Sequence, residues 1–267
     1  MTMCPDKVVV VDNASTDGTS DYLAGLSDDL FHVLRLEKNA GGAGGFCAGM
    51  REAVHMGCDA LWIMDDDTIP GKDSLRVLSE ELFCREDNGF AGSMVLWTDG
   101  NRHQMNKPLF LTHDDEAETV RLVQSSSFVS LLVKSSIVRE VGLPYKDFFI
   151  WGDDSEFTKR ITEKGYRGLY VTDSVVLHKT AANYGPEIHT APYGTAWKFY
   201  YGTRNAMFLD RKRYRNPFTF FLKELNHLRL ALHNIGKRAP EERRDFRRSV
   251  LKGFRDGFSF RPDIEYI

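Results

Sequence analysis

The chain has 267 residues, of which 42% are hydrophobic and 27% are charged, and its formal net charge is −3. These values are ordinary for a soluble globular protein, and no stretch reaches the ~20 apolar residues that cross a bilayer. The first residues lack the apolar segment of a signal peptide, and the four cysteines have neither disulfide-framework nor zinc-site spacing. We therefore expect a cytoplasmic protein with reduced thiols.

Basic residues are concentrated toward the end of the chain. Residues 198–267 hold 17 Lys and Arg against 8 Asp and Glu, whereas the remainder holds 18 against 30. A basic tail on an acidic body indicates an anionic partner, either a membrane surface or a phosphate-bearing substrate. We expect no nucleic-acid partner, because no recognised binding motif accompanies the charge.

The first predicted strand is the β-branched run Val8–Val11, which is typical of a strand buried on both faces of a parallel sheet. Asp12 and Asn13 follow it, and a polar turn then leads to a helix near 20–26. For residues 15–17 we favour a helix-capping role. For Asp12, at a strand's carboxyl end, we favour a ligand-binding role.

A second strand is expected over residues 31–36, and it runs into a segment, 37–46, with four glycines in five residues. A helix is expected over 47–56. Glycines between a strand and a helix can cradle phosphate on backbone N–H groups. The G-x-G-x-x-G spacing of a dinucleotide site is absent, which disfavours a dehydrogenase, and a plain turn is the simpler alternative.

Three adjacent acids, Asp65, Asp66 and Asp67, follow the strand-like run 60–64. This order places the acids at the carboxyl edge of a sheet, where α/β proteins bind ligands. Oxygen ligands suit Mg²⁺ or Mn²⁺. The alternative is a solvated acidic turn.

The middle of the chain alternates helical and strand patterns. We expect a helix over residues 74–85, a strand over 90–96, a loop or hairpin insertion over 98–124, a strand over 126–134 and a short helix over 135–141.

A second acidic motif lies where an aromatic turn leads into a helical run. Asp153 and Glu156 have capping-box spacing, which is a structural explanation for both. Asp154 is not needed for that cap and is well placed to act as a base. Phe149 and Trp151 are candidates for a sugar-stacking platform.

The last strands are expected over 168–171 and 174–177, and the second delivers His178 at its end. A lone histidine is more often structural, but this one ends a strand as the acids do, so we favour a metal ligand. Residues 193–215 are rich in Tyr, Arg and Lys. A helix over 218–235 either covers the core or contacts a membrane surface.

Several of these motifs together resemble the family 2 glycosyltransferases of the GT-A fold. They are residues 10–19 (Val-Val-Asp-Asn-Ala-Ser-Thr-Asp-Gly-Thr), the acidic triplet, residues 151–157 (Trp-Gly-Asp-Asp-Ser-Glu-Phe) and His178. The glycine-rich segment 39–46 is most similar to that of bacterial galactofuranosyltransferases, with rhamnosyltransferases as near relatives. Residues 200–205 (Tyr-Tyr-x-x-Arg-Asn) also fit this group.

The resemblance implies an α/β protein with a GT-A (Rossmann-like) mixed, mainly parallel sheet flanked by helices, and a C-terminal helical extension. We expect a catalytic domain over 1–195 and a basic, aromatic helical extension over 196–267. Family members normally begin with a further strand and helix, so the first strand–helix unit is expected to be missing here.

The resemblance also implies the roles of individual residues. The catalytic base would be Asp154, and the divalent ion, Mn²⁺ or Mg²⁺, would be held by Asp65, Asp67 and His178. The donor nucleotide sugar would be bound by Asp12, Asn13, Asn39, Gly41, Gly42, Asp65 and Asp66. The acceptor would be bound by Trp151, Asp153 and Glu156.

The implied function is inverting, metal-dependent transfer of a sugar from a UDP- or dTDP-sugar to a glycan or polyprenyl-linked acceptor in cell-surface polysaccharide synthesis. Galactofuranose from UDP-galactofuranose is the first expectation. Rhamnosyl transfer from dTDP-rhamnose and an inactive nucleotide-sugar-binding protein are the alternatives. The basic C-terminal region would give peripheral contact with the inner face of the plasma membrane.

Overall fold

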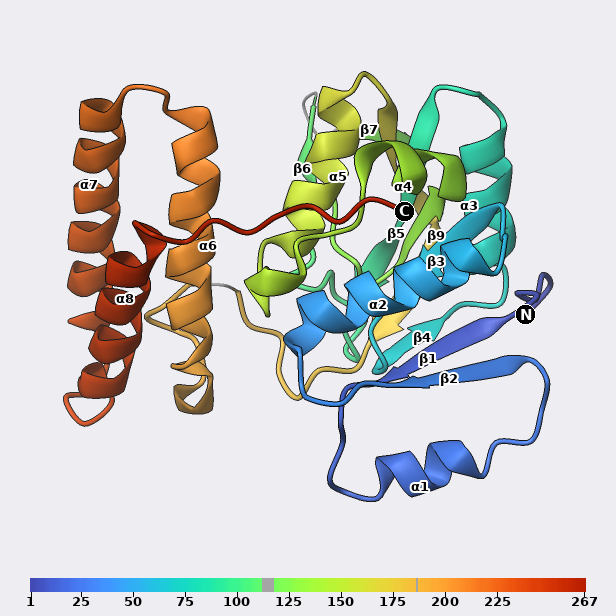
Figure 1. Ribbon diagram of the computed structural model, residues 1–267, viewed down its shortest axis with the longest axis horizontal. Helices are drawn as coiled ribbons and strands as arrows, with labels where there is room; N and C mark the ends of the chain where they lie inside the picture. Colours follow the sequence, from blue (N-terminus) through green and yellow to red (C-terminus); the bar gives the residue numbers. More distant parts are fainter. Residues whose placement is uncertain (112–117, 186) are drawn as a thin grey trace. The chain divides into compact units, whose positions relative to one another are not determined.

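A computed structural model describes residues 1–111, 118–185 and 187–267, which fold into two compact units. The sheet unit comprises residues 1–147, 153–183 and 264–267. The helical unit comprises residues 148–152 and 184–263. The chain leaves the sheet unit twice and returns to it at the C-terminus (Figure 1). The expected domains, 1–195 and 196–267, stay a prediction.

The sheet unit contains all the described strands. In chain order they are β1 (Val8–Asp12), β2 (Phe31–Arg35), β3 (Ala60–Ile63), β4 (Thr68–Pro70), β5 (Asn88–Leu96), β6 (Leu109–Phe110), β7 (Val120–Ser125), β8 (Leu131–Lys134) and β9 (Arg167–His178). β1 and β2 form a parallel pair, and the main sheet has the order β3-β8-β5-β9-β7-β6 with β4 paired to β9.

The helices of the sheet unit lie at or near the positions expected from the sequence. The sheet unit has α1 (Thr19–Ala24), α2 (Gly41–His55), α3 (Ser74–Phe83), α4 (Ser135–Val141) and α5 (Asp153–Glu163). The helical unit has α6 (Lys198–Arg213), α7 (Pro217–Ile235) and α8 (Arg243–Gly257). Short 3-10 turns occur at η1 (Lys146–Phe148) and η2 (Tyr193–Thr195). The helical character expected of the C-terminal region is therefore confirmed.

The expectation of a mainly parallel sheet is wrong. Among the described strands, only the β1–β2 and β5–β9 pairs are parallel, and the other five pairs are antiparallel. Hydrophobic runs identify buried strands but do not reveal their direction, because a strand covered on both faces is apolar whichever way it runs. The fold is nevertheless a mixed α/β sheet with helices, as expected.

Consecutive residues of the central strands point to opposite faces of the main sheet. On β5, Phe90 packs into a cluster with residues of α2, α4 and α5, whereas Ala91 packs against α3. Tyr170 and Leu169 of β9 divide between the same two clusters. Successive side chains of a strand point to opposite faces of the sheet, so the two clusters lie on opposite faces. Helices therefore cover both faces of the main sheet.

Three local expectations need correction or refinement. The segment that we expected as a loop before a helix at residue 47 is already helical from Gly41. The two short strands over 168–177 are one strand, β9, whose pairing with β5 shifts register in its middle. The insertion over 98–124 contains the β6–β7 hairpin, and its residues 112–117 lie outside the described part of the chain.

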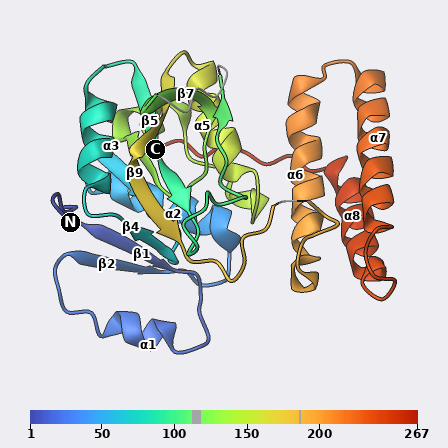
Figure 2. The same ribbon diagram turned by 180° about the vertical axis from the view of Figure 1, so that it is seen from behind.

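The helical unit has its own apolar core. Phe199 of α6, Ile235 of α7, and Phe246 and Val250 of α8 are buried together. Figure 2 shows α6 and α7 side by side with α8 against them. Asn216 begins α7 by accepting hydrogen bonds from two backbone N–H groups, as an N-cap residue does. α8 had no counterpart among the predicted elements.

The last four residues belong to the sheet unit and are held by charge. The Glu265 carboxylate binds the Arg51 guanidinium through two contacts of 2.5 and 2.8 Å, and Lys146 lies 3.1 Å away. The backbone carbonyl of Glu265 accepts from the N–H of Leu143 at 2.8 Å. The Arg51–Glu265 contact joins α2 to the end of the chain.

We predict that Glu265→Gln lowers the free energy of unfolding by about 1 kcal/mol, the value expected of a bidentate, partly exposed pair. The hydrogen bond from Arg51 lowers the pKa of Glu265 below its ordinary value. The contribution is therefore fully present above the unfolded pKa and is lost as pH falls through the lower folded pKa. Urea unfolding at two pH values measures it.

The matched control is Glu163→Gln, whose exposed pair with Lys159 on α5 should contribute about 0–0.5 kcal/mol. Equal effects of both substitutions at neutral pH would show that the Glu265 contact does not stabilise the fold.

Candidate functional site

Asp65, Asp67 and His178 converge at one end of the main sheet. β4 pairs antiparallel with β9 so that Thr68 lies opposite His178. This register brings the turn before β4 to the imidazole, whose Nε2 lies 2.9 Å from an Asp67 oxygen and 3.6 Å from an Asp65 oxygen. The three residues therefore form a candidate metal site, assembled from segments more than 100 residues apart in the chain.

The His178 ring is oriented for binding through Nε2. Its Nδ1 lies 2.9 Å from the side-chain oxygen of Asn106, and the His103 ring packs against it with 4.6 Å between centroids. A hydrogen bond at Nδ1 leaves the Nε2 lone pair for a metal. Burial lowers the pKa of His178, although Asp67 opposes the shift, so the imidazole stays neutral over a wider pH range.

Asn106 and His103 were not predicted as site residues. Both lie in the polar segment 98–124, whose hydrophobic residues show no clear periodicity. No spacing in the sequence connects them to His178. His103 is buried, hydrogen bonds to Thr180 through Nε2 at 2.9 Å, and has a pKa lowered to about 4 by burial. Both side chains contact the His178 ring, Asn106 through a hydrogen bond and His103 through ring packing.

Asp66 lies apart from this cluster. It is exposed, whereas its two neighbours are half-buried. Within a tight turn, successive side chains point in different directions, so adjacent acids need not share a ligand. A role of Asp66 in donor binding stays a prediction.

A second part of the site is the junction of β1 with α2. The Asn13 side chain accepts from the N–H of Ala40 and donates to the carbonyl of Gly41, both at 2.8 Å. The Asn39 side chain accepts from the N–H of Gly41 at 2.8 Å. Gly41 has a φ of 72°, a conformation that glycine adopts without strain. The predicted donor-binding residues on the two segments are thus neighbours.

Asp12 is buried at the end of β1 and organises the turn that follows. Its carboxylate accepts from the Ser15 N–H at 2.8 Å and from the Ser20 hydroxyl, and the Ser20 bond in particular lowers the pKa of Asp12. Arg35 lies 3.7 Å away. These contacts give Asp12 a structural task, and its contact with a nucleotide stays a prediction.

Asp153 and Asp154 begin α5 in the same unit as the metal-ligand cluster. Asp153 is buried, and burial raises its pKa well above the ordinary value, with further contributions from the charges of Asp154 and Asp65. Burial also raises the pKa of Asp154, while the N–H groups of Ser155 and Phe128 oppose the shift. The carboxyls of Asp153 and Asp65 therefore lie within electrostatic reach.

Glu156 has a structural partner. Its carboxylate pairs with Arg160 at 3.0 Å, and the Arg160 guanidinium donates to the carbonyls of Val141 and Leu143. Both charged side chains are largely buried. The pair ties α5 to the loop after α4, and acceptor binding by Glu156 stays a prediction.

Trp151 belongs to the helical unit, in the strained turn that directly precedes α5. Phe149 and Trp151 each have a φ of 66°, which non-glycine residues adopt rarely. The buried Asn205 amide donates to the carbonyls of Phe148, Ile150 and Trp151 at 2.9–3.1 Å. Asn205 therefore fixes the turn that leads into Asp153 and Asp154.

The aromatic rings of this turn already have partners within the helical unit. Trp151 meets Phe199 edge to face with 5.1 Å between centroids, and Phe149 stacks on Tyr201 with 4.6 Å between centroids. Sequence reasoning placed Arg204 and Asn205 in a matching motif but assigned them no role. A sugar-stacking role for Trp151 stays a prediction.

Comparison with known proteins agrees with these motifs. Residues 2–134 match the family described as Glycosyl transferase family 2. Galactofuranosyltransferase GlfT1 of Mycolicibacterium smegmatis is 30% identical over 176 residues, which are 60% of this chain and 57% of the relative. GlfT1 of Mycobacterium tuberculosis is 30% identical over 192 residues, 66% of this chain and 62% of the relative. The chain thus spans about three fifths of the length of these relatives.

Solved structures show the same fold at low identity. A crystal structure of GalNAc-T7 with UDP, GalNAc and Mn²⁺ has a TM-score of 0.58 at 14% identity, covering 98% of this chain and 49% of that one. Staphylococcus aureus TarS has a TM-score of 0.51 at 15% identity, covering 96% of this chain and 50% of that one. The chain therefore belongs to glycosyltransferase family 2 and has the GT-A fold.

Proposed function

We propose that this protein is an inverting, metal-dependent glycosyltransferase that moves a sugar from a nucleotide sugar to an acceptor hydroxyl. The observation that carries the proposal is the placement, in one unit, of the Asp65–Asp67–His178 cluster and the two carboxyls that begin α5. Displacement at an anomeric carbon needs a binding site for the leaving diphosphate and a base for the acceptor.

The residues of the cluster fit a divalent ion. Two carboxylates and a neutral imidazole are suitable ligands for Mn²⁺, and Mg²⁺ is accepted by the carboxylates with water. Such an ion supplies neutralisation of the charge that develops on the leaving nucleotide diphosphate. Asp65, Asp67 and His178 would hold it, and Asn106 would keep the His178 ring in the required orientation.

Asp154 is the proposed base. In-line displacement requires a carboxylate on the side of the anomeric carbon opposite the diphosphate, where it takes the proton of the attacking hydroxyl. Asp153 and Glu156, with Trp151, are proposed to line the acceptor side. A pKa raised by burial makes the Asp154 carboxylate a better proton acceptor than an exposed one.

The donor site is proposed to lie at the β1–α2 junction. Asp12 and Asn13 would contact the nucleotide, and Asn39, Gly41 and Gly42 would approach the diphosphate through their backbone. Asp65 and Asp66 would complete this site. The hydrogen bonds that join Asn13 to the start of α2 support a preformed arrangement.

UDP-galactofuranose is the proposed donor. The similarity to two galactofuranosyltransferases at 30% identity supports it, together with the glycine-rich segment. The proposed acceptor is a glycan or polyprenyl-linked intermediate of cell-surface polysaccharide. dTDP-rhamnose is the second candidate donor, and absence of any turnover would favour a nucleotide-sugar-binding protein.

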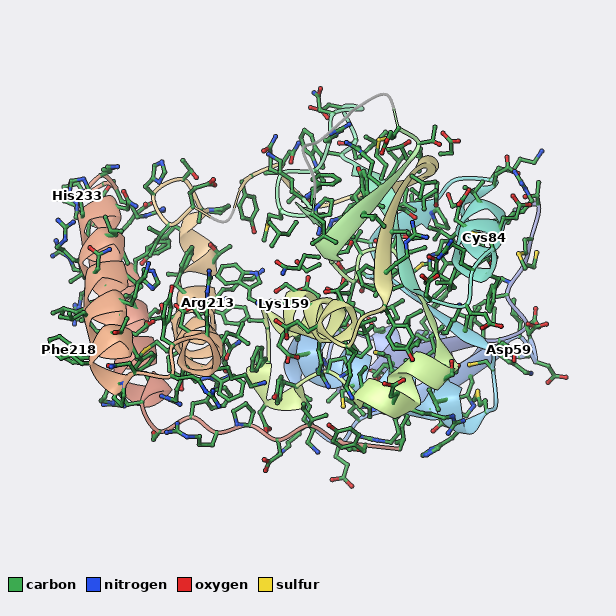
Figure 3. All side chains as sticks on the ribbon, turned by 90° about the horizontal axis from the view of Figure 1, so that it is seen from above. Asp59, Cys84, Lys159, Arg213, Phe218 and His233 are labelled. Carbon is green, nitrogen blue, oxygen red and sulfur yellow. The ribbon has the colours of Figure 1, made fainter. Side chains whose placement is uncertain are left out.

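Contact with an anionic membrane is proposed for α7. Among the described residues, no helix is long and apolar enough to cross a bilayer. α7 nevertheless exposes Phe218, Phe221, Leu222 and Leu225, at 69, 46, 49 and 46% of their surfaces, in a region with a large excess of basic residues. Phe218 lies near one end of the helix, as Figure 3 shows. Apolar and basic side chains on one helix suit a membrane surface.

We predict donor-dependent transfer from UDP-galactofuranose, detected by mass spectrometry of a lipid-linked acceptor, and its loss in Asp154→Asn. This substitution keeps the size of the side chain but removes proton acceptance, which typically costs about 10²–10⁴-fold in rate. Donor affinity should stay close to that of the unmodified protein. The rate should also fall as pH drops through the raised pKa of Asp154, because only the ionised carboxylate accepts a proton.

Asp153→Asn is the matched comparison at the neighbouring position. If Asp153→Asn stops transfer in a folded protein while Asp154→Asn works normally, the base is assigned to the wrong carboxylate. Transfer from dTDP-rhamnose instead of UDP-galactofuranose would overturn the donor assignment alone.

We predict that Asp67→Asn weakens Mn²⁺ binding, measured by isothermal titration calorimetry, by about tenfold or more, because one charged ligand is lost. Asp66→Asn removes the same charge at an exposed neighbouring position and should have a much smaller effect. Because burial lowers the pKa of His178, Mn²⁺ affinity should decline steeply only below the ordinary histidine pKa of about 6.5. Equal losses in both variants would indicate general charge attraction without a defined site.

We predict that the protein co-sediments with liposomes containing anionic lipid and is released by salt, since each basic residue near such a surface contributes about 1 kcal/mol. Phe218→Ser with Phe221→Ser should reduce binding. Leu109→Ser, an exposed apolar residue of the sheet unit, is the control and should not. Binding that ignores both lipid charge and salt would contradict the proposal.

A further inference from the structure

A second group of metal-ligand side chains lies in the helical unit, between α6 and α7. Asp210 is on α6, and Glu224 and His227 are on α7. Glu224 and His227 are three residues apart and therefore lie on one face of their helix. The two helices are neighbours in both ribbon views (Figures 1 and 2). The proposed transfer reaction uses none of these side chains.

The spacing of the three side chains suits a single small cation. Nδ1 of His227 lies 3.5 Å from an Asp210 oxygen and 3.6 Å from Oε1 of Glu224. All the ligand atoms lie within 4.8 Å of one another. Around a tetrahedral zinc ion with bonds of about 2.0–2.2 Å, ligand atoms are about 3.3–3.6 Å apart. Small side-chain adjustments would therefore complete the coordination.

Glu224 provides an independent indication of a cationic ligand. Its side chain is only 3% exposed, and its Oε1 has no hydrogen-bond donor among the described residues. The neighbouring Arg211 guanidinium donates its hydrogen bonds to backbone carbonyls, among them those of Gly257 and Phe258, and acts on Glu224 only through its charge. A buried carboxylate oxygen without a donor is costly, and a cation bound at Oε1 would remove that cost.

The cluster is accessible from solvent on the His227 side. The His227 side chain is 47% exposed, so an ion can enter there and keep a water ligand. One imidazole with two carboxylates favours a first-row transition metal over Mg²⁺, which prefers oxygen ligands and octahedral geometry. We propose that Asp210, Glu224 and His227 bind one divalent transition-metal ion, represented by Zn²⁺, which fastens α6 to α7.

The experiment titrates the metal-free full chain with Zn²⁺ by isothermal titration calorimetry. His227→Ala should bind one equivalent fewer than the unmodified protein, or bind that equivalent about tenfold or more weakly. His233→Ala is the matched control, because His233 is an exposed histidine near the end of α7 opposite to Phe218 (Figure 3). It should bind Zn²⁺ as the unmodified protein does. Loss of Zn²⁺ binding at the first cluster would not affect this difference.

Thermal unfolding gives a second measurement. Zn²⁺ should raise the Tm of the unmodified protein, because it binds only the folded state, and part of this rise should disappear in Asp210→Asn. Identical Zn²⁺ binding by His227→Ala and His233→Ala would overturn the proposal. A second result would also overturn it: Glu224→Gln is more stable than the unmodified protein without metal, and Zn²⁺ raises its Tm by the full amount. Asp210 and Glu224 would then be an acid pair that shares a proton.

Discussion

The pairing of β4 with β9 is the constraint on which the candidate site depends. Three adjacent carboxylates repel one another, and a turn carrying them is stable only if positive charge or hydrogen-bond donors lie nearby. The register that sets Thr68 opposite His178 brings an imidazole to two of the three acids and leaves Asp66 in solvent. A shift of one residue in the pairing of β4 with β9 would turn the His178 side chain to the other face of the sheet, away from Asp65 and Asp67.

The second constraint is the turn before α5. Two non-glycine residues with positive φ are unfavourable, and the arrangement persists because the Asn205 amide binds three of the carbonyls that the turn exposes. The chain passes from this rigid turn directly into Asp153 and Asp154. Asn205 belongs to α6, so the conformation of this turn depends on a helix some 50 residues later in the sequence.

Buried carboxylates mark both candidate sites. Asp153 in the sheet unit and Glu224 in the helical unit are almost fully removed from water, where an ionised carboxylate without compensation is expensive. Glu156 is buried to a similar extent, but Arg160 compensates its charge. Glu156 thus holds two elements together, whereas Asp153 and Glu224 are buried beside other carboxyls, those of Asp154 and Asp210.

The sequence by itself determined most elements, the ends of the strands and the residue types of the site, because burial periodicity and turn chemistry are local properties. Asp65, Asp67 and His178 were predicted from the sequence to lie at strand ends, and Asn39 is adjacent in sequence to the glycine-rich segment. Only the tertiary structure decided that most strand pairs are antiparallel, that the glycines begin a helix, that Asn13 contacts that helix start, that Asn106 and His103 contact His178, and that Asn205 binds the turn before α5. Strand direction and contacts between distant segments depend on how elements pack, and no short-range pattern of residue types records that.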